Sequence, residues 1–360
     1  MDCFIVGTSS FLPGPAVGNE DIQRYLGVIE GEDDVRERVL RMNGIERRHY
    51  AQTEEQKPTF DVYGLASAAA TSCLQQNPDH VTFLSAGTTY APLSGPGIAS
   101  ILHARLQDEN QLNHPVEISS HGGICSSATT AIVAGVRAVQ SGHHPSALCV
   151  GAEHASEVLK STEIRPVDDR DQHENIRSSQ WFMSVFLRFM LSDGSGAVLL
   201  RNAPNPSGLS LKVNWTQSAS FAHAAPLCMK LESRTSLLSQ DLSVLSRNLF
   251  PCAKKFVSQA MDATNDSVDN HDMILPHMSS FFFRRQMEKV IESNCGEPKS
   301  PTPYWTNLAT VGNTGSASIF LMLDHYLREQ DVRDGQKLLL FVPESGQFNF
   351  VLVSLTACRA

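Results

Sequence analysis

Three side chains of the kinds used in nucleophilic catalysis lie far apart in the chain: Cys125, His277 and Asn313. A glycine pair comes shortly before Cys125 in HGGICSSATTAIVAG, and a run of small residues typical of a helix follows it. A helix macrodipole and free backbone N–H groups stabilise an anion at a helix N-terminus. We therefore expect a lowered pKa and a nucleophilic thiolate at Cys125. The alternative is a structural cysteine buried in the core.

The other two residues come at the borders of apolar runs. His277 ends the strand-like run MILPH, and functional side chains gather at strand ends in α/β folds. Asn313 precedes an apolar helical run in LATVGNTGSAS. Each allows a structural interpretation as well, a histidine satisfied in the core or a turn that caps a helix. Both are candidate site residues, and they can act with Cys125 only if the fold places them beside it.

The elements that must position these residues alternate between strand-like and helical runs. Strand-like runs of the first half include CFIVGTSSFLP, VTFLSAGT, SALCVGAEHA and SGAVLLRN. The second half has LSLKVNWTQ, DMILPH and the hairpin-like pair KLLLFVPES and FNFVLVSLTA, with a helix expected near 238–262. This rhythm predicts an α/β protein of two similar halves, residues 1–202 and 203–360. The charged interval 160–181 is interpreted as a surface or substrate-side loop, or as a solvated loop without a role.

Composition excludes several classes of function. The 360 residues carry a net charge of -9, which argues against a nucleic-acid binder because such a protein clusters Lys and Arg on phosphates. The opening MDCFIVGTSSFLPG lacks a basic segment followed by an apolar run, so we expect neither a signal peptide nor membrane insertion. A small or carrier-borne substrate fits this composition better.

The metal-ligating residue types are scattered. Eight cysteines form no C-x-x-C pair, and thirteen histidines show no H-E-x-x-H spacing. This pattern favours reduced thiols in a cytoplasmic protein and predicts neither a metal site nor a disulfide. We expect no cofactor.

Taken in order, the segments resemble the β-ketoacyl-acyl-carrier-protein synthase III family over essentially the whole chain. The matching pieces are VGTSSFLP, NGIERRHYA, the region around Cys125, VGAE, SDGSGAVLL, LPH, GNTGSAS and ESGQF. The resemblance implies an α/β thiolase fold, with two similar halves in a five-layered αβαβα arrangement. It also implies a homodimer that acts on acyl thioesters carried by coenzyme A or acyl carrier protein.

The resemblance also implies roles for individual residues. Cys125 would carry the acyl group as a thioester, and His277 and Asn313 would stabilise the enolate of the second substrate. The backbone N–H groups of Cys125 and Gly346 would form the oxyanion hole. Asp193, in SDGSGA, is expected to hold a turn rather than to react.

Some positions depart from the family pattern near the expected tunnel. The family's H-Q-A-N is H-M-S-S here, so Met278 and Ser280 replace polar support for the histidine. A Trp that stacks on the coenzyme A adenine is absent, with Asp34 and Val35 near its place. A donor bound to carrier protein therefore becomes the stronger expectation.

Two further departures concern the acyl pocket and docking. Gly95 stands where the family often has a bulky Phe, which would open the pocket end or the dimer contact to a longer chain. Arg284 and Arg285 follow a run of three phenylalanines and are interpreted as the basic face of a partly buried helix. The functional alternative is that they meet an acidic carrier protein.

With these departures, the chain resembles ketosynthases of specialised fatty acid and polyketide metabolism that join two acyl units and cyclise the product. Ketosynthases that form dialkylresorcinols or cyclohexanediones are examples. One alternative is a chain-initiating decarboxylative condensation with a malonyl donor. Acyl transfer from Cys125 to an oxygen or nitrogen acceptor is another. A non-catalytic partner subunit is the last, and it usually lacks one of the three site residues that this chain retains.

Overall fold

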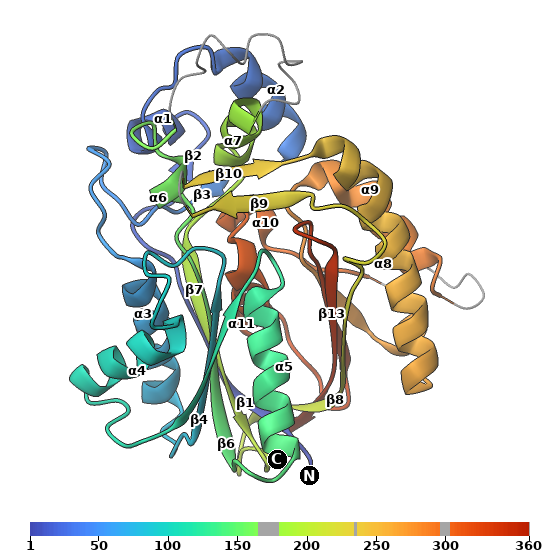
Figure 1. Ribbon diagram of the computed structural model, residues 1–360. Helices are drawn as coiled ribbons and strands as arrows, with labels where there is room; N and C mark the ends of the chain where they lie inside the picture. Colours follow the sequence, from blue (N-terminus) through green and yellow to red (C-terminus); the bar gives the residue numbers. More distant parts are fainter. Residues whose placement is uncertain (165–179, 234–235, 296–302, 360) are drawn as a thin grey trace.

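A nine-stranded mixed sheet forms the centre of the protein in the computed structural model, which describes residues 1–164, 180–233, 236–295 and 303–359 (Figure 1). The strand order is β11-β12-β13-β8-β1-β7-β6-β4-β5. Residues 165–179, most of the polar interval 160–181, lie outside the described residues. The bounds of these strands are β1 Phe4–Phe11, β4 Phe83–Thr88, β5 Glu117–Gly122, β6 Ser146–Glu153, β7 Gly194–Arg201, β8 Leu209–Ser220, β11 Met273–Pro276, β12 Lys337–Pro343 and β13 Asn349–Arg359.

The two halves of the chain repeat one strand topology. In the first half β4 and β6 are parallel, and β7 and then β1 follow in antiparallel steps. In the second half β11 and β12 are parallel, and β13 and then β8 follow in antiparallel steps. The halves meet where β1 pairs with β8, with Ile5 opposite Leu211. The division at residue 202 stays a prediction, since one sheet runs through both halves.

Helices cover this sheet in layers. Helices α3 and α4 share an apolar core with strands of the first half, and α8 packs on the far side of the second half. Helices α5 and α11 lie side by side between the two halves and share one core with strands of both (Figure 1). Their bounds are α3 Val62–Gln76, α4 Ile98–Asp108, α5 Ser127–Gln140, α8 Leu242–Thr264 and α11 Ser318–Glu329. The layers follow the expected αβαβα order.

Helix α5 approaches the sheet closely because its contact face is built from small residues. A Cβ on Gly135 would lie 2.3 Å from the Sγ of Cys149 on β6. On β4, a Cβ on Gly87 would lie 2.6 Å from the Cα of Ala128. Such distances leave no room for larger side chains. The chain segment of Cys125 is thereby fixed against the end of the sheet.

Short elements form a cap over the end of the sheet where Cys125 lies (Figure 1). Helix α7 packs against the two-stranded sheet of β9 and β10, and α2 packs against α7. The cap elements are β2 Val17–Gly18, α1 Ile22–Leu26, α2 Asp33–Asn43, β3 Arg47–Arg48, α6 Ser156–Leu159, α7 Gln180–Arg188, β9 Met229–Glu232 and β10 Leu237–Gln240. Short helices between the larger elements are η3 Val268–Asn270, η4 Phe281–Phe283, α9 Arg284–Glu292, α10 Leu308–Val311 and η5 Gly315–Ala317.

One helix differs from the sequence-based expectation. The helix expected near 238–262 begins only at Leu242, because Asp241 caps it by accepting hydrogen bonds from the N–H groups of Ser243 and Val244. The residues before it form β10 instead. Among the described residues, no helix combines the length and the apolar character needed to cross a bilayer.

Candidate active site

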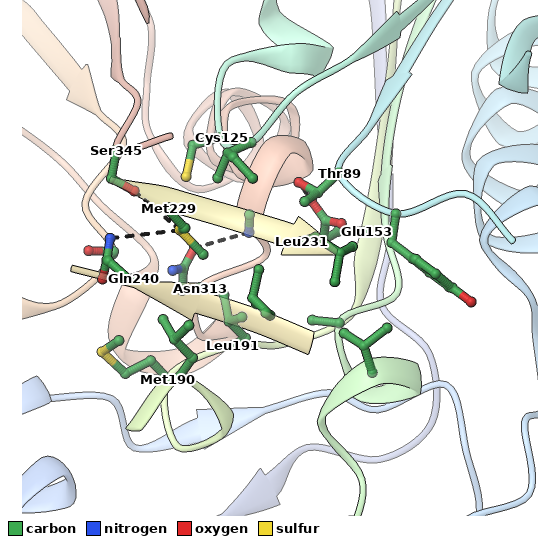
Figure 2. Close-up of a pocket in the computed structure, with 18 of the residues that line it drawn as sticks. Thr89, Cys125, Glu153, Met190, Leu191, Met229, Leu231, Gln240, Asn313 and Ser345 are labelled. Atoms are coloured by element: carbon green, nitrogen blue, oxygen red, sulfur yellow. Dashed lines mark hydrogen bonds between the residues drawn. The ribbon is translucent and has the colours of Figure 1, made fainter. Parts of the chain in front are cut away.

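Cys125 lies in the turn between β5 and α5, two residues before the first residue of that helix. Its side chain is buried and its sulfur points into the cavity under the cap (Figure 2). Burial raises the pKa of the Cys125 thiol, and the carboxylates of Glu344 and Glu153 raise it further. Backbone N–H groups of Cys125 and Ser345 oppose this shift without reversing it. The expected lowering of this pKa by the helix terminus is therefore wrong, since desolvation and two like charges outweigh it.

His277 directly follows β11 and is buried. Its Nδ1 lies 2.5 Å from the hydroxyl oxygen of Ser318, the first residue of α11. Its Nε2 is buried without a hydrogen-bond partner among the described residues. Burial lowers the pKa of His277 to about 4, so the ring is neutral at neutral pH. The histidine thus has one anchored nitrogen and one free for a ligand.

Asn313 is held between two segments of the chain. Its backbone forms an isolated parallel bridge with Leu191, and its N–H donates to the carbonyl of Met190. The side-chain Oδ1 accepts a hydrogen bond from the N–H of Gly315 at 3.0 Å (Figure 2). Because Oδ1 is occupied, the Nδ2 donors are the part of the amide left for a ligand in the cavity that Asn313 lines.

Two cavities meet at Cys125. The larger, with an empty volume of about 650 Å³, has Asn313 in its wall and a largely apolar lining from α6, α7 and the β9–β10 hairpin. The second, with an empty volume of about 390 Å³, has His277 in its wall and is bounded by residues of α8 and α9. Cys125 and Ser345 line both. The three candidates from the sequence therefore converge on one centre.

The loop after β12 supplies the other groups beside the thiol. The backbone N–H of Ser345 forms a hydrogen bond that favours the Cys125 thiolate. The expected donor Gly346 lines neither of the two cavities. The carbonyl of Gly346 accepts hydrogen bonds from Cys228 and Met229, and a Cβ there would lie 2.8 Å from the Glu344 carboxylate. In this structure Ser345 thus takes the place beside the thiol that we expected for Gly346.

Glu153, at the end of β6, is a buried acid in the wall of the larger cavity. Its Oε2 accepts hydrogen bonds from the Thr89 hydroxyl at 2.7 Å, and from the N–H and hydroxyl of Ser316 at 3.0 and 2.9 Å. Burial raises the pKa of Glu153. In the sequence, Glu153 stands out only as part of the VGAE segment that resembles the family. A strand-terminal acid after an apolar run was the available signal for a site residue.

Support for His277 comes from Ser318 and not from its own loop. Ser280 instead caps η4, where its hydroxyl accepts from the N–H of Phe282. Met278 is buried and lines the second cavity. Asp34 and Val35 lie in the first turn of α2 and line neither cavity that contains Cys125.

The expectation that Gly95 lines the acyl pocket is wrong for the single chain. Gly95 is exposed, a Cβ there would meet nothing within 4 Å, and it lines neither of the two cavities at Cys125. The nearby Thr89 and Tyr90 line the larger cavity instead. Because Gly95 lies in an exposed loop, it could border an acyl pocket only through a contact with a second copy of the chain.

Arg284 and Arg285 begin α9, whose Met287, Val290 and Ile291 are buried. Both arginines are exposed, and Arg284 forms an ion pair with Glu288 at 2.9 Å. The expected helix with a buried face and a basic face is therefore present. Carrier docking by these arginines stays a prediction.

Asp193 joins three segments of the first half. Its carboxylate accepts hydrogen bonds from the N–H of Ala51 at 2.7 Å and from the N–H and hydroxyl of Ser156 at 2.9 and 2.5 Å. The contacts fit the structural role expected for it. Among the described residues, no group of three or more His, Cys, Asp or Glu side chains is placed to hold a metal ion.

Comparisons with known proteins agree with this geometry. Residues 262–347, which contain His277 and Asn313, match a family model described as the C-terminal part of 3-oxoacyl-[acyl-carrier-protein] synthase III. A β-ketoacyl-[acyl-carrier-protein] synthase III of Acholeplasma laidlawii is 22% identical over 324 residues, 89% of either chain. The chain is thus similar to 3-oxoacyl-[acyl-carrier-protein] synthase III proteins over most of its length.

Solved structures of other proteins have the same fold as this chain. AbyA1, described as a tetronic acid condensing enzyme, superimposes with a TM-score of 0.78 at 19% identity, covering 98% of this chain and 99% of that one. Xanthomonas campestris OleA, solved with bound lauric acid and lauroyl-CoA, superimposes with a TM-score of 0.76 at 16% identity and covers 99% of both chains. The expected thiolase-type α/β fold is confirmed.

Proposed function

We propose that this protein forms carbon–carbon bonds between acyl thioesters through an acyl group carried on Cys125. The observation that carries the proposal is the meeting of two cavities at one buried thiol, with Asn313 in the wall of one and His277 in the wall of the other. A condensing enzyme needs a nucleophile for the first acyl group and hydrogen-bond donors for the enolate of the second.

In the first step the Cys125 sulfur attacks the thioester carbonyl of the donor. The new C–S bond forms, the donor C–S bond breaks, and the carrier leaves as a thiol with the proton that Cys125 gives up. The N–H groups of Cys125 and Ser345 are the donors available to the oxyanion of the tetrahedral intermediate. The acyl chain then lies in the larger cavity, whose lining is largely apolar.

In the second step Asn313 and His277 hold the enolate oxygen of the second thioester. Asn313 can donate from Nδ2, because Gly315 already occupies Oδ1. His277 can donate from Nε2 when the Ser318 hydroxyl donates to Nδ1, which fixes the tautomer. The enolate carbon attacks the acyl carbonyl, and Cys125 leaves as the free thiol after taking a proton.

We infer that the second substrate is a β-ketoacyl thioester. The proton that its α-carbon loses is balanced by the proton that the leaving Cys125 sulfur takes up, and no carbon dioxide is released. Joining to a second acyl unit and cyclisation would follow, in specialised fatty acid or polyketide metabolism. The similarity to AbyA1 and OleA, and the apolar lining of the larger cavity, support this choice. The similarity to 3-oxoacyl-[acyl-carrier-protein] synthase III supports the alternative, a chain-initiating malonyl donor that loses carbon dioxide.

The carrier of the donor is proposed to be an acyl carrier protein, held at the basic face of α9 by Arg284 and Arg285. Both side chains are exposed, and α9 borders the second cavity, which has His277 in its wall. An acidic carrier gains from basic groups beside such a cavity.

Intact-protein mass spectrometry tests the covalent step. The protein is incubated with acyl thioesters on coenzyme A and on carrier protein, beside the Cys125→Ala variant. A mass increase that requires Cys125 supports the acyl enzyme, and the preferred chain identifies the first substrate. A folded protein that takes up no acyl group from any donor would contradict the proposal and favour a non-catalytic partner subunit.

The second step separates the remaining candidates. Acyl-loaded protein is mixed with a β-ketoacyl thioester or with malonyl carrier protein, and product mass and released carbon dioxide are measured. Carbon dioxide release with the malonyl donor alone would make the enzyme a chain-initiating one. Transfer of the acyl group to an alcohol or amine, without a new carbon–carbon bond, would establish acyl transfer instead.

A further inference from the structure

A carboxylate occupies the N-terminus of the helix that follows the nucleophile. Glu344 comes directly after β12, and its Oε2 accepts hydrogen bonds from the backbone N–H of Ser126 at 3.1 Å and from the Ser126 hydroxyl at 2.5 Å. Ser126 is the residue next to Cys125 and stands at the N-cap position of α5. A negative charge therefore lies where a free helix terminus would stabilise a thiolate.

The surrounding loop holds this carboxylate in place. Asn349 donates from Nδ2 to the Ser126 hydroxyl at 2.7 Å, and the N–H of Glu344 donates to the carbonyl of Asn349 at 2.9 Å. Gly346 has no side chain and so leaves room for the Glu344 carboxylate. Glu344 is buried, and the ion pairs found among the described residues do not include it. Its charge is therefore not neutralised by a salt bridge within the described chain.

We propose that Glu344, in addition to burial, holds Cys125 as a neutral thiol in the resting protein and so helps to set the pH at which this thiol becomes a nucleophile. The carboxylate already accepts hydrogen bonds from the groups that could otherwise solvate a thiolate at the start of α5. The proposal deepens the proposed function, since it concerns the thiol that is to accept the acyl group.

Two other titratable groups face Cys125 from neighbouring elements. Glu153 reaches the larger cavity from the end of β6, and its charge disfavours the thiolate in the same sense as Glu344. His277 reaches the second cavity after β11 as a neutral ring, so it supplies no positive charge to stabilise a thiolate. The pair is therefore a neutral thiol and a neutral imidazole, not an ion pair. Acyl loading is then expected to rise with pH as the thiolate fraction grows.

The test is the pH dependence of Cys125 alkylation by iodoacetamide, followed by mass spectrometry of the peptide that contains Cys125. Wild-type protein is compared with Glu344→Gln, which keeps the shape and an acceptor for the Ser126 N–H but removes the charge. Ser126→Ala is the matched control, because it removes the hydroxyl contact and keeps the charge. Circular dichroism at each pH verifies that the variants are folded.

The Glu344→Gln variant is expected to shift the alkylation midpoint down by about one pH unit, which is about a tenfold faster reaction at any pH below the midpoint. Ser126→Ala is expected to shift it by less than half as much. An unchanged profile in Glu344→Gln would overturn the proposal. A wild-type midpoint at or below about 8.5, the ordinary value for cysteine, would overturn it without any variant.

Alkylation measures the reactivity of the Cys125 thiol alone and needs no acyl substrate. The outcome therefore stands whether or not Cys125 is acylated by any donor, and a failure of the proposed function would be visible separately in the acyl-loading experiment.

Discussion

The protonation state of His277 follows from its burial. An ordinary histidine titrates near 6.5, whereas desolvation lowers the pKa of His277 to about 4. Between these values the unfolded chain binds a proton that the folded protein does not. The free energy of unfolding therefore falls as pH falls through this window, and the contribution is intact above it.

A His277→Asn variant isolates this contribution from those of the other histidines. Wild-type protein is expected to lose roughly 2–3 kcal/mol more stability than the variant between about pH 7.5 and 4.5. Urea unfolding at both pH values measures the difference. Equal losses in the two proteins would mean that the ring is protonated in the folded state.

Ser318 is expected to decide which nitrogen of His277 carries the proton. Its hydroxyl lies 2.5 Å from Nδ1, and donation to that nitrogen leaves Nε2 as an N–H donor for the enolate. We expect Ser318→Ala to slow the condensation step roughly tenfold to a hundredfold while acyl loading of Cys125 keeps its rate. Single-turnover kinetics with preloaded protein separates the two steps.

The Ser318→Thr variant is the matched control because it retains the hydroxyl. Its condensation rate is expected to recover at least part of what Ser318→Ala loses. A rate in Ser318→Ala equal to that of wild type would show that the tautomer does not depend on this contact.

At the scale of single elements, the β9–β10 hairpin forms one wall of the larger cavity. Leu231 and Leu238 line it together with residues of α7. A Trp at position 231 would fill apolar space that an acyl chain needs, and a filled pocket rejects additional methylenes by steric exclusion. We expect Leu231→Trp to reduce loading of long acyl chains at least tenfold relative to short ones.

Leu242→Trp is a suitable control, since Leu242 is partly exposed at the start of α8 and lines neither cavity at Cys125. Competition between short and long acyl thioesters, read by intact mass, measures the preference. An unchanged preference in Leu231→Trp would mean that the acyl chain lies elsewhere.

The elements differ in how well the sequence predicts them. The long strands and helices of the two halves follow their hydrophobic patterns, and so does the hairpin of β12 and β13. The β9–β10 hairpin does not, because its strands are four residues long, pair only with one another and are partly exposed. A wall of the larger cavity could therefore not be predicted from local pattern.

The residues of the site also differ in whether the sequence predicts them. Cys125, His277 and Asn313 each lie at a border between a turn and an apolar run, which made them visible in the sequence. Ser318 and Glu344 act through contacts with residues 41 and 218 positions away, His277 and Ser126. No local pattern encodes such pairs, since they depend on how α11 and the loop after β12 approach the site.

At the scale of the whole molecule, β5 is an unprotected edge of the large sheet. Within the described part of the chain it pairs with β4 alone, and Ile118 on it is 43% exposed. Natural proteins rarely leave an edge strand with apolar side chains uncovered, because it can pair with another chain. The family resemblance implies a homodimer, and we expect two copies of this chain to pair through β5, which would also bring the exposed loop at Gly95 near the partner.

Substituting Lys for Ile118 places a charge on this edge and is expected to convert a dimer, of twice 39.4 kDa, into monomers. Val28→Lys is the matched control, since Val28 is 68% exposed but lies in the cap between α1 and α2. Light scattering after gel filtration gives both masses. If wild-type protein is monomeric, or if both variants dissociate equally, the β5 edge is not the interface, and Gly95 then has no route to a pocket in either copy.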